Sequence, residues 1–291
     1  MNTLTQKNNS PRVFNLKLAT KMGALYHADC QVLLTSIKDN SVDCIFADPP
    51  FNLGKNYGSR TVVDRMPELE YLEWTQRWIS QCVRILKPSG SLFIYNIPKW
   101  LIFISSYLNS SENMEFRHWI AIKMKNGFPI KKRLHPVHYG LLYYVKRGKM
   151  LKFHVIRYPS PVCRHCGELI RDYGGYLKKY RTDKNSVPLI QIADVWDDVN
   201  PNIHNKNRPK SINELPSTIP ERVIRMATNK GDIVLDPFAG GGSTLSMAES
   251  NARYWIGCEL GTTVHAKNRI LKEAKATKNH LPPQRIQKIF K

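Results

Sequence analysis

Residues 48–51 read Asp-Pro-Pro-Phe and follow a short run of apolar and small residues at 44–47. A residue that precedes a proline is kept out of the helical region, so Asp48 and Pro49 are both held extended. Neither Pro49 nor Pro50 has a backbone N–H to donate. The stretch therefore presents a carboxylate and carbonyl oxygens on a stiff backbone. Such an acceptor-only surface suits an exocyclic amino group with two hydrogens to give.

A nucleobase amine is a poor nucleophile because its lone pair is delocalised into the ring. Hydrogen bonds to Asp48 and to the Pro49 carbonyl would stabilise positive charge as such an amine attacks. Phe51 could stack on the base. To reach the site, the base would have to be flipped out of the nucleic-acid double helix. The alternative is a proline-rich loop that merely follows a strand.

A second stretch, GDIVLDPFAGGGSTLSMAE at 231–249, has a different chemistry. An apolar run leads to Asp236, then to three glycines, Gly240 to Gly242, and then to a helix capped by Ser243 or Thr244. Glycines at such a turn let the backbone come close to a ligand. Glu259 ends the next apolar run, at roughly the 20-residue offset from which an acid reaches ribose hydroxyls. The pattern predicts a nucleoside site. It disfavours a dinucleotide, since the spacing is not G-x-G-x-x-G, and a structural glycine-rich turn is the alternative.

The elements around these stretches alternate between strand and helix. Apolar periodicity predicts strands over 23–30, 42–48, 91–97, 116–124, 139–147, 231–238 and 253–260. It predicts helices over 31–40, 67–86, 99–111, 219–228, 245–250 and 262–276. This order predicts an α/β fold with a doubly wound, mostly parallel sheet and helices on both faces. Asp48 and Gly240 must then meet at neighbouring strand ends.

Five segments are expected along the chain. Residues 1–20 read as a flexible basic tail, 21–150 as the catalytic half of the core, and 151–208 as a basic insertion with weak periodicity. Residues 209–276 return to the first pattern as the cofactor-binding half of the same core, and 277–291 form a second basic tail.

The net charge is +21, from 44 Lys and Arg against 23 Asp and Glu. Because like charges repel, such an excess predicts a polyanionic partner, with nucleic acid first. A generally basic protein is the alternative. No run approaches the ~18 apolar residues of a membrane span, and the first residues lack the apolar core of a signal peptide. Cysteines in expected buried strands fit a reducing, cytoplasmic setting.

The segments ADPPF, LDPFAGGGST and WIGCEL together resemble the S-adenosylmethionine-dependent amino-methyltransferases of DNA. The catalytic motif precedes the cofactor motif, with a divergent basic stretch between them, and this order is similar to the β class of these enzymes. The resemblance covers about residues 23–150 and 210–275. It implies a seven-stranded, Rossmann-like methyltransferase sheet. It also implies that the inserted residues 151–208 form the target-recognition region.

The resemblance also implies roles for single residues. The catalytic tetrapeptide falls on Asp48, Pro49, Pro50 and Phe51. The cofactor loop falls on Asp236, Phe238, Ala239, Gly240, Gly242, Ser243 and Thr244. Glu259 is the implied ribose acid and Asp29 the acid near the adenine of the cofactor. A T-x-K-P type stretch aligns with NELP at 213–216, where Asn213 and Pro216 fit but Leu215 replaces the usual lysine. The family's lysine at this position is the implied contact to the methionine carboxylate of the cofactor, and Leu215 cannot make that contact with its side chain.

Several basic and aromatic residues are candidate DNA contacts, since Tyr can pack on sugars and bases while Lys and Arg meet phosphates. They are Lys55 and Arg60 in the loop after Phe51, and Tyr173, Tyr176, Lys178, Lys179 and Arg208 in the insertion. Solvated turns are the alternative for these stretches.

Cys163 and Cys166 form one C-x-x-C, but no second pair follows to complete four zinc ligands. His154, His165 and His204 are the candidate partners. Free thiols are the favoured interpretation, so no metal is expected.

The expected function is methyl transfer from S-adenosylmethionine to an exocyclic amine of duplex DNA with base flipping. Within the family an Asp at position 48 favours adenine N6 over cytosine N4, which stays as the alternative. More distant alternatives are an RNA or protein amino-methyltransferase and an inactive DNA-binding protein. A homodimer and a cognate restriction endonuclease are further expected partners.

Overall fold

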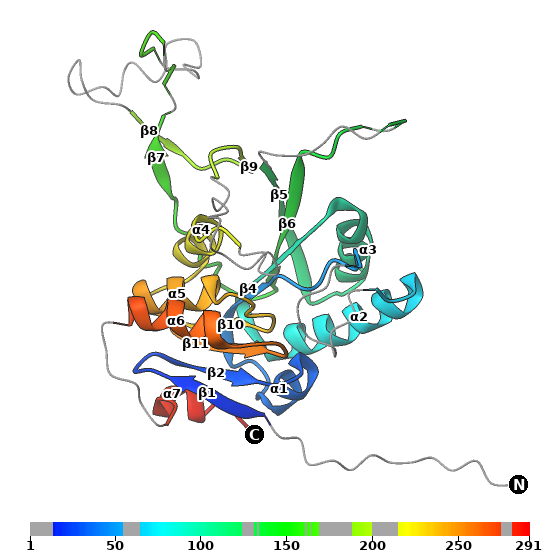
Figure 1. Ribbon diagram of the computed structural model, residues 1–291, viewed down its shortest axis with the longest axis vertical. Coiled ribbons are helices and arrows are strands. Elements are labelled where there is room, and N and C mark those ends of the chain that lie inside the picture. The colour runs from blue at the N-terminus through cyan, green and yellow to red at the C-terminus, as the bar shows by residue number, and fades with distance from the viewer. Residues whose placement is uncertain are drawn as a thin grey trace, which may run out of the picture.

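The computed structural model describes residues 14–54, 65–123, 131–132, 134–160, 162–163, 165–168, 188–199, 215–274 and 281–291. Within these ranges the chain forms an α/β fold around one nine-stranded sheet (Figure 1). The strand order is β1-β2-β11-β10-β3-β4-β6-β5-β9, and β7 and β8 form a separate two-stranded sheet.

The strands are β1 (Asn15–Ala19), β2 (Gly23–His27), β3 (Val42–Ala47), β4 (Leu86–Asn96), β5 (Met114–Lys123), β6 (His138–Lys146), β7 (Arg157–Pro159), β8 (Leu189–Gln191), β9 (Val195–Trp196), β10 (Ile233–Asp236) and β11 (Tyr254–Glu259). The helices are α1 (Cys30–Ser36), α2 (Glu68–Ile85), α3 (Pro98–Asn109), α4 (Thr218–Ala227), α5 (Ser243–Ser250), α6 (Val264–Glu273) and α7 (Gln284–Gln287).

Two hydrophobic cores lie on opposite faces of the sheet. Helices α1, α2 and α3 supply one core, and α4, α5 and α6 supply the other. The buried strands contribute to both by alternation: Ile45 and Ala47 of β3 face the first core, while Cys44 and Phe46 face the second. A sheet covered on both faces has apolar residues at successive positions, which explains the continuous apolar runs in the sequence.

The chain changes direction across the sheet between β10 and β3. These two strands pair in parallel, with Val234 opposite Cys44 and Leu235 opposite Ile45. From β3 the chain passes through α2 to β4 on one side, whereas from β10 it passes through α5 to β11 on the other. In open α/β sheets, ligands bind at the carboxyl ends of the strands at such a switch point.

A network of charges ties the amino-terminal edge of the same strands together. Asp43 of β3 is buried and accepts from Lys87 Nζ (2.7 Å), Lys152 Nζ (2.9 Å) and the backbone N of Ile233 (3.0 Å). Lys152 also pairs with Asp232 (2.8 Å). The network joins β3 to β10 and to the segment after β6. It therefore fixes the amino-terminal ends of the two strands whose carboxyl ends carry the candidate site.

The strands of the expected insertion are attached to the core through α4. Arg222 of α4 lies over the Trp196 ring of β9 (5.1 Å to the ring centroid) and the Tyr158 ring of β7 (5.7 Å), and it donates to Asp198 (2.9 Å). Strand β9 itself extends the main sheet by pairing in parallel with β5.

The sheet departs from the expected one at both edges. Beyond the seven strands predicted from the core pattern it includes β1 and β9. Strand β6 is antiparallel to both β4 and β5, because β5 and β6 follow each other without a crossover helix between them.

Neither terminal segment is simply a tail. Residues 15–19, expected to be flexible, form β1, which pairs antiparallel with β2. At the other end, Ile286 of α7 is fully buried, and the Phe290 ring packs on Phe14 (5.5 Å) and Tyr26 (5.6 Å). These contacts join the two ends of the chain, and local charge in the sequence does not reveal them.

Candidate active site

The Asp-Pro-Pro-Phe corner begins where β3 ends, at the carboxyl edge of the sheet. Its backbone is held by two aromatic donors from the helices that cover this face. The Tyr71 hydroxyl of α2 donates to the Pro50 carbonyl (2.6 Å), and Trp100 Nε1 of α3 donates to the Phe51 carbonyl (2.7 Å). Neither of these two donors bonds to the Pro49 carbonyl.

Asp48 is half-buried beside a group of three aromatic rings. The centroid of Phe51 lies 5.9 Å from that of Tyr95 and 5.6 Å from that of Tyr139, and the two tyrosine rings are 5.2 Å apart. Burial raises the pKa of both tyrosines, and the negative charge of Asp48 raises each pKa further. The site is therefore a carboxylate at the edge of an apolar aromatic surface.

The glycine turn lies between β10 and α5. Gly242 has φ +78°, and a Cβ there would lie 2.7 Å from the Ala266 Cα of α6, so only glycine fits without a shift. Gly240 has φ +48°, but a Cβ there would meet nothing closer than the Phe238 carbonyl at 3.8 Å. The backbone is thus packed against α6 at Gly242 and open at Gly240, as a turn that approaches a ligand requires.

Acidic side chains stand at the carboxyl ends of β10, β11 and β2. Glu259 accepts from the backbone N–H of Gly240 (2.8 Å) and of Gly261 (2.6 Å), so it is fixed against the glycine turn. Asp29 is exposed and caps α1 by accepting from Gln31 N (2.8 Å). The register of β11 and β2 places Glu259 opposite His27, two residues before Asp29.

Asp236 differs from these two acids because it is buried. Desolvation raises the pKa of its carboxyl group from 3.8 to about 7, despite hydrogen bonds from Thr244 and from the Phe238 N–H (2.9 Å) that lower it. Asp236 is therefore largely protonated below neutral pH. Its place at the base of the turn indicates that it shapes the loop from beneath.

The structure brings the two stretches together. Strands β3 and β10 are hydrogen-bonded neighbours that run in parallel, so Asp48 and residues 237–242 leave the sheet at the same edge. Neighbouring strands lie about 4.8 Å apart. Asp29, Asp236 and Glu259 belong to the same edge, while Ser243 and Thr244 are buried in the first turn of α5.

The sequence reasoning missed the aromatic residues that surround the site. Tyr95 and Tyr139 lie in strands, and Tyr71 and Trp100 lie in helices, where periodicity identifies them only as core positions. The one available signal was composition, because Tyr71 and Trp100 carry a polar O–H or N–H that usually finds a partner when buried.

Some predicted residues lie outside the described ranges. They are Lys55, Arg60, Tyr173, Tyr176, Lys178, Lys179, Arg208 and Asn213. Within the described residues, Ser243 Oγ donates to the Leu215 carbonyl (2.8 Å), so Leu215 meets the turn through its backbone where a lysine was expected from the family pattern.

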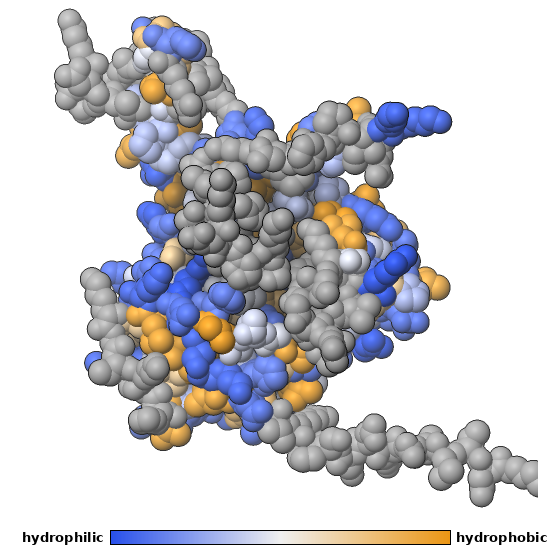
Figure 2. Space-filling model, in the orientation of Figure 1, coloured by the Kyte–Doolittle hydropathy of each residue, from blue (hydrophilic) through white to orange (hydrophobic). Residues whose placement is uncertain are grey.

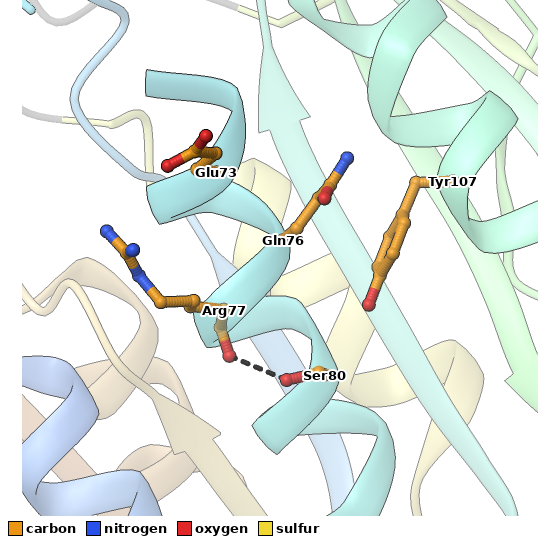
Figure 3. A pocket seen from close by; sticks show the side chains of 5 residues that line it. All are labelled: Glu73, Gln76, Arg77, Ser80 and Tyr107. Carbon is orange, nitrogen blue, oxygen red and sulfur yellow. Dashed lines mark hydrogen bonds between the residues drawn. The ribbon is translucent and has the colours of Figure 1, made fainter. Parts of the chain in front are cut away.

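Other features of the molecule lie elsewhere. A shallow pocket of about 310 Å³ between α2 and α3 is lined by Glu73, Gln76, Arg77, Ser80 and Tyr107 (Figure 3). The described residues contain no cluster of three metal-binding side chains. None of the helices in the described ranges is both long and apolar enough to cross a bilayer. On the viewed face, apolar side chains are interspersed with hydrophilic ones over α5 and α6 (Figure 2).

A family model described as DNA methylase matches residues 42–268, a span that holds both stretches of the site and all the strands between β3 and β11. The chain belongs to the DNA methylase family. This membership accounts for the two motifs, their order and the switch point where they meet.

Relatives of this family member include the Type II methyltransferase M.BamHI of Bacillus amyloliquefaciens, 44% identical over 281 residues. That alignment covers 94% of this chain and 64% of M.BamHI, so the chain spans less than two thirds of the relative's length. The DNA adenine methyltransferase YhdJ of Escherichia coli is 30% identical, with 82% of this chain and 78% of YhdJ covered.

Solved structures agree on the fold. The cytosine-N4-specific PvuII DNA methyltransferase superposes with a TM-score of 0.61 at 17% identity, covering 95% of each chain. At that identity the likeness shows a shared α/β architecture.

Proposed function

We propose that this chain is a site-specific DNA methyltransferase that transfers a methyl group from S-adenosylmethionine to an exocyclic amine of a base in duplex DNA. The observation that carries the proposal is the pairing of β3 with β10, which places the Asp48 corner beside the glycine turn within the segment matched by the family. The Type II methyltransferase relatives support the same activity.

The residues at the switch point fit S-adenosylmethionine. Gly240 leaves its side of the turn open. We assign Glu259 to the ribose hydroxyls and Asp29, which lies beyond it on the neighbouring strand, to the adenine. Phe238 offers a partly buried ring backed by Trp74 and Trp78. When bound, the sulfonium supplies an electrophilic methyl group, so that an N–C bond forms as the C–S bond breaks and one amine proton is released.

The chain's own contribution is to hold and polarise the amine. Asp48 and the Pro49 carbonyl accept its two N–H hydrogens, which draws the lone pair out of the ring and stabilises the developing positive charge. Phe51 packs with Tyr95 and Tyr139 into an aromatic cluster beside Asp48, and the exposed part of this cluster would contact the base. Because these groups are fixed before the base arrives, alignment supplies much of the rate.

The target base is adenine N6 in our prediction, with cytosine N4 as the alternative. Both amines present two hydrogens to the same pair of acceptors, so the corner alone accommodates either. The base must be flipped out of the duplex to reach the recessed Asp48.

Recognition of DNA is proposed to reside in the basic segment 151–208, with phosphate contacts from the lysines and arginines predicted there and in the loop after Phe51. Arg222 supports this arrangement because it fixes β7 and β9 to the catalytic core. The Type II relatives also support a restriction–modification setting, in which a cognate endonuclease is the expected partner. A homodimer and a cytoplasmic location complete the proposal.

The test uses S-adenosylmethionine with a labelled methyl group, incubated separately with duplex DNA, RNA and protein. Digestion of labelled DNA to nucleosides should yield N6-methyl-deoxyadenosine, and N4-methyl-deoxycytidine would establish the alternative. Label in RNA or protein alone would refute the DNA proposal.

The Asp48→Ala variant should lose methyl transfer by more than ~100-fold while it still binds S-adenosylmethionine. The matched control is Asp39→Ala, at an exposed aspartate that lies between α1 and β3, at the opposite edge of the sheet. Activity of the Asp48 variant within ~10-fold of the wild type would contradict the assigned role.

A further inference from the structure

The Asp-Pro-Pro-Phe corner has few backbone donors with which to bond to neighbouring elements. Its two prolines have no N–H, so the loop cannot be fixed to its neighbours through backbone donors at Pro49 and Pro50. It must instead be held through its carbonyl oxygens, by donors from other elements. The structure supplies these donors from two helices that are not part of either sequence motif.

Tyr71 of α2 is one of these donors. Its side chain is 2% exposed, and its hydroxyl donates to the Pro50 carbonyl (2.6 Å) while it accepts from Asn96 Nδ2 (3.3 Å). Asn96 is fully buried at the carboxyl end of β4, which is the next strand after β3 in the sheet. Tyr71 thus fastens the corner to the adjacent strand.

Trp100 of α3 holds the next residue of the corner. Its ring packs against Tyr71 (4.6 Å between centroids), and its Nε1 donates to the Phe51 carbonyl (2.7 Å). Two consecutive carbonyls are therefore held by two rings in contact, which leaves Asp48 and the Pro49 carbonyl directed by a rigid backbone.

Helix α2, which carries Tyr71, also contacts the loop of the glycine turn. Trp74, one turn after Tyr71 in α2, lies 5.7 Å from the Tyr71 ring and 5.7 Å from the Phe238 ring. Trp78 lies one turn further on and contacts Phe238 edge-to-face at 5.2 Å. One face of α2 therefore contacts both the corner that follows β3 and the loop that follows β10.

We propose that Tyr71 is a positioning residue for methyl transfer, and that Trp74 links the Asp-Pro-Pro-Phe corner to the cofactor loop through one face of α2. The inference rests on the proposed function, since it assigns the acceptors and the cofactor loop to their roles. Tyr71 acts through Pro50 on Asp48 and the Pro49 carbonyl. Trp74 sets the distance between these acceptors and the loop at Phe238.

The first test is Tyr71→Phe, which keeps the ring and removes only the hydroxyl. The variant leaves the Pro50 carbonyl without its donor, so the single-turnover methylation rate should fall roughly 10-fold. The dissociation constant for S-adenosylmethionine should stay within about 2-fold, because the hydrogen bonds of the hydroxyl described above join it to Pro50 and Asn96. Amide hydrogen exchange in residues 51–54 should become faster than in the wild type.

Tyr107→Phe is the matched control, because Tyr107 also lies on the α2–α3 pair but at the shallow pocket on its outer side. It should match the wild type in rate and in exchange. A Tyr71 variant that melts at a lower temperature yet keeps the wild-type rate and exchange would show a merely structural role and overturn the proposal.

The second test is Trp74→Leu, which should weaken S-adenosylmethionine binding by about 3-fold or more and speed exchange in residues 238–242 as well as 51–54. In the Tyr71→Phe/Trp74→Leu double variant, the loss of rate should be smaller than the product of the two single losses, as for residues in contact. Independent losses, or exchange unchanged at 238–242, would overturn the link.

The readouts separate this inference from the proposed function. Absence of methyl transfer by the wild-type protein on DNA, RNA and protein would refute the function, and the exchange measurements would then decide the anchoring alone. Faster exchange at 51–54 in Tyr71→Phe would uphold it, and unchanged exchange would overturn it.

Discussion

The buried carboxyl of Asp236 predicts a pH dependence of stability with a definite sign. Burial raises its pKa from 3.8 to about 7 in the folded protein, whereas the unfolded chain has the ordinary value. Between these two values the unfolded chain ionises while the folded protein keeps its proton, so this residue reduces stability as pH rises. The Asp236→Asn variant cannot ionise and removes this dependence.

The size of the effect follows from the shift. One pKa unit corresponds to about 1.4 kcal/mol, so a shift of roughly 3 units is worth about 4 kcal/mol in total. Part of that falls below pH 5, and between pH 5 and pH 8 the difference in unfolding free energy between variant and wild type should change by ~2.5 kcal/mol in favour of the variant.

Urea denaturation of the wild type and Asp236→Asn at pH 5, 6.5 and 8 measures this difference. The control is Asp39→Asn, where the hydrogen bond from Arg84 lowers the pKa of the carboxyl below its ordinary value. Asp39 is ionised in both states above pH 5, so its variant should show a constant difference. A flat difference for Asp236→Asn, or one that favours the wild type as pH rises, would refute the reasoning.

Three further predictions concern the framework around the site. Gly242→Ala should destabilise the fold by about 1–3 kcal/mol in urea denaturation, because φ is +78° and the new Cβ would lie 2.7 Å from the Ala266 Cα. Asp43→Ala should cost about 3 kcal/mol at pH 7, since it leaves two partly buried lysines without their shared partner. Although burial opposes it, the Ile233 N–H and these lysines lower the pKa of Asp43, so its stabilisation should hold above pH 4 and disappear as pH falls further. Arg222→Ala should speed amide exchange in β7 and β9 by removing the contact with Trp196, while exchange in β3 stays unchanged.

The α/β class and the two motifs could be read from the sequence because their signals are local. The apolar runs of β3 and β10 are continuous since both faces of the sheet are covered. The prolines of the corner and the glycines of the turn indicate the backbone conformations of these two loops directly. The order of the motifs was equally visible along the chain. These features predict that the two motifs meet at neighbouring strand ends, but they do not predict which other strands and helices surround them.

Only the tertiary structure decided the contacts between elements that are distant in the sequence. The pairing of β3 with β10 joins segments about 190 residues apart. The order of the elements predicts that the two motifs meet, whereas the register of the two strands is known only from the tertiary structure. The packing of β1 and α7, the antiparallel placement of β6 and the raised pKa of Asp236 likewise depend on contacts with distant residues. The donors that hold the corner, Tyr71 and Trp100, are indistinguishable in sequence from ordinary core aromatics, because a hydrogen bond to a distant carbonyl leaves no periodic trace.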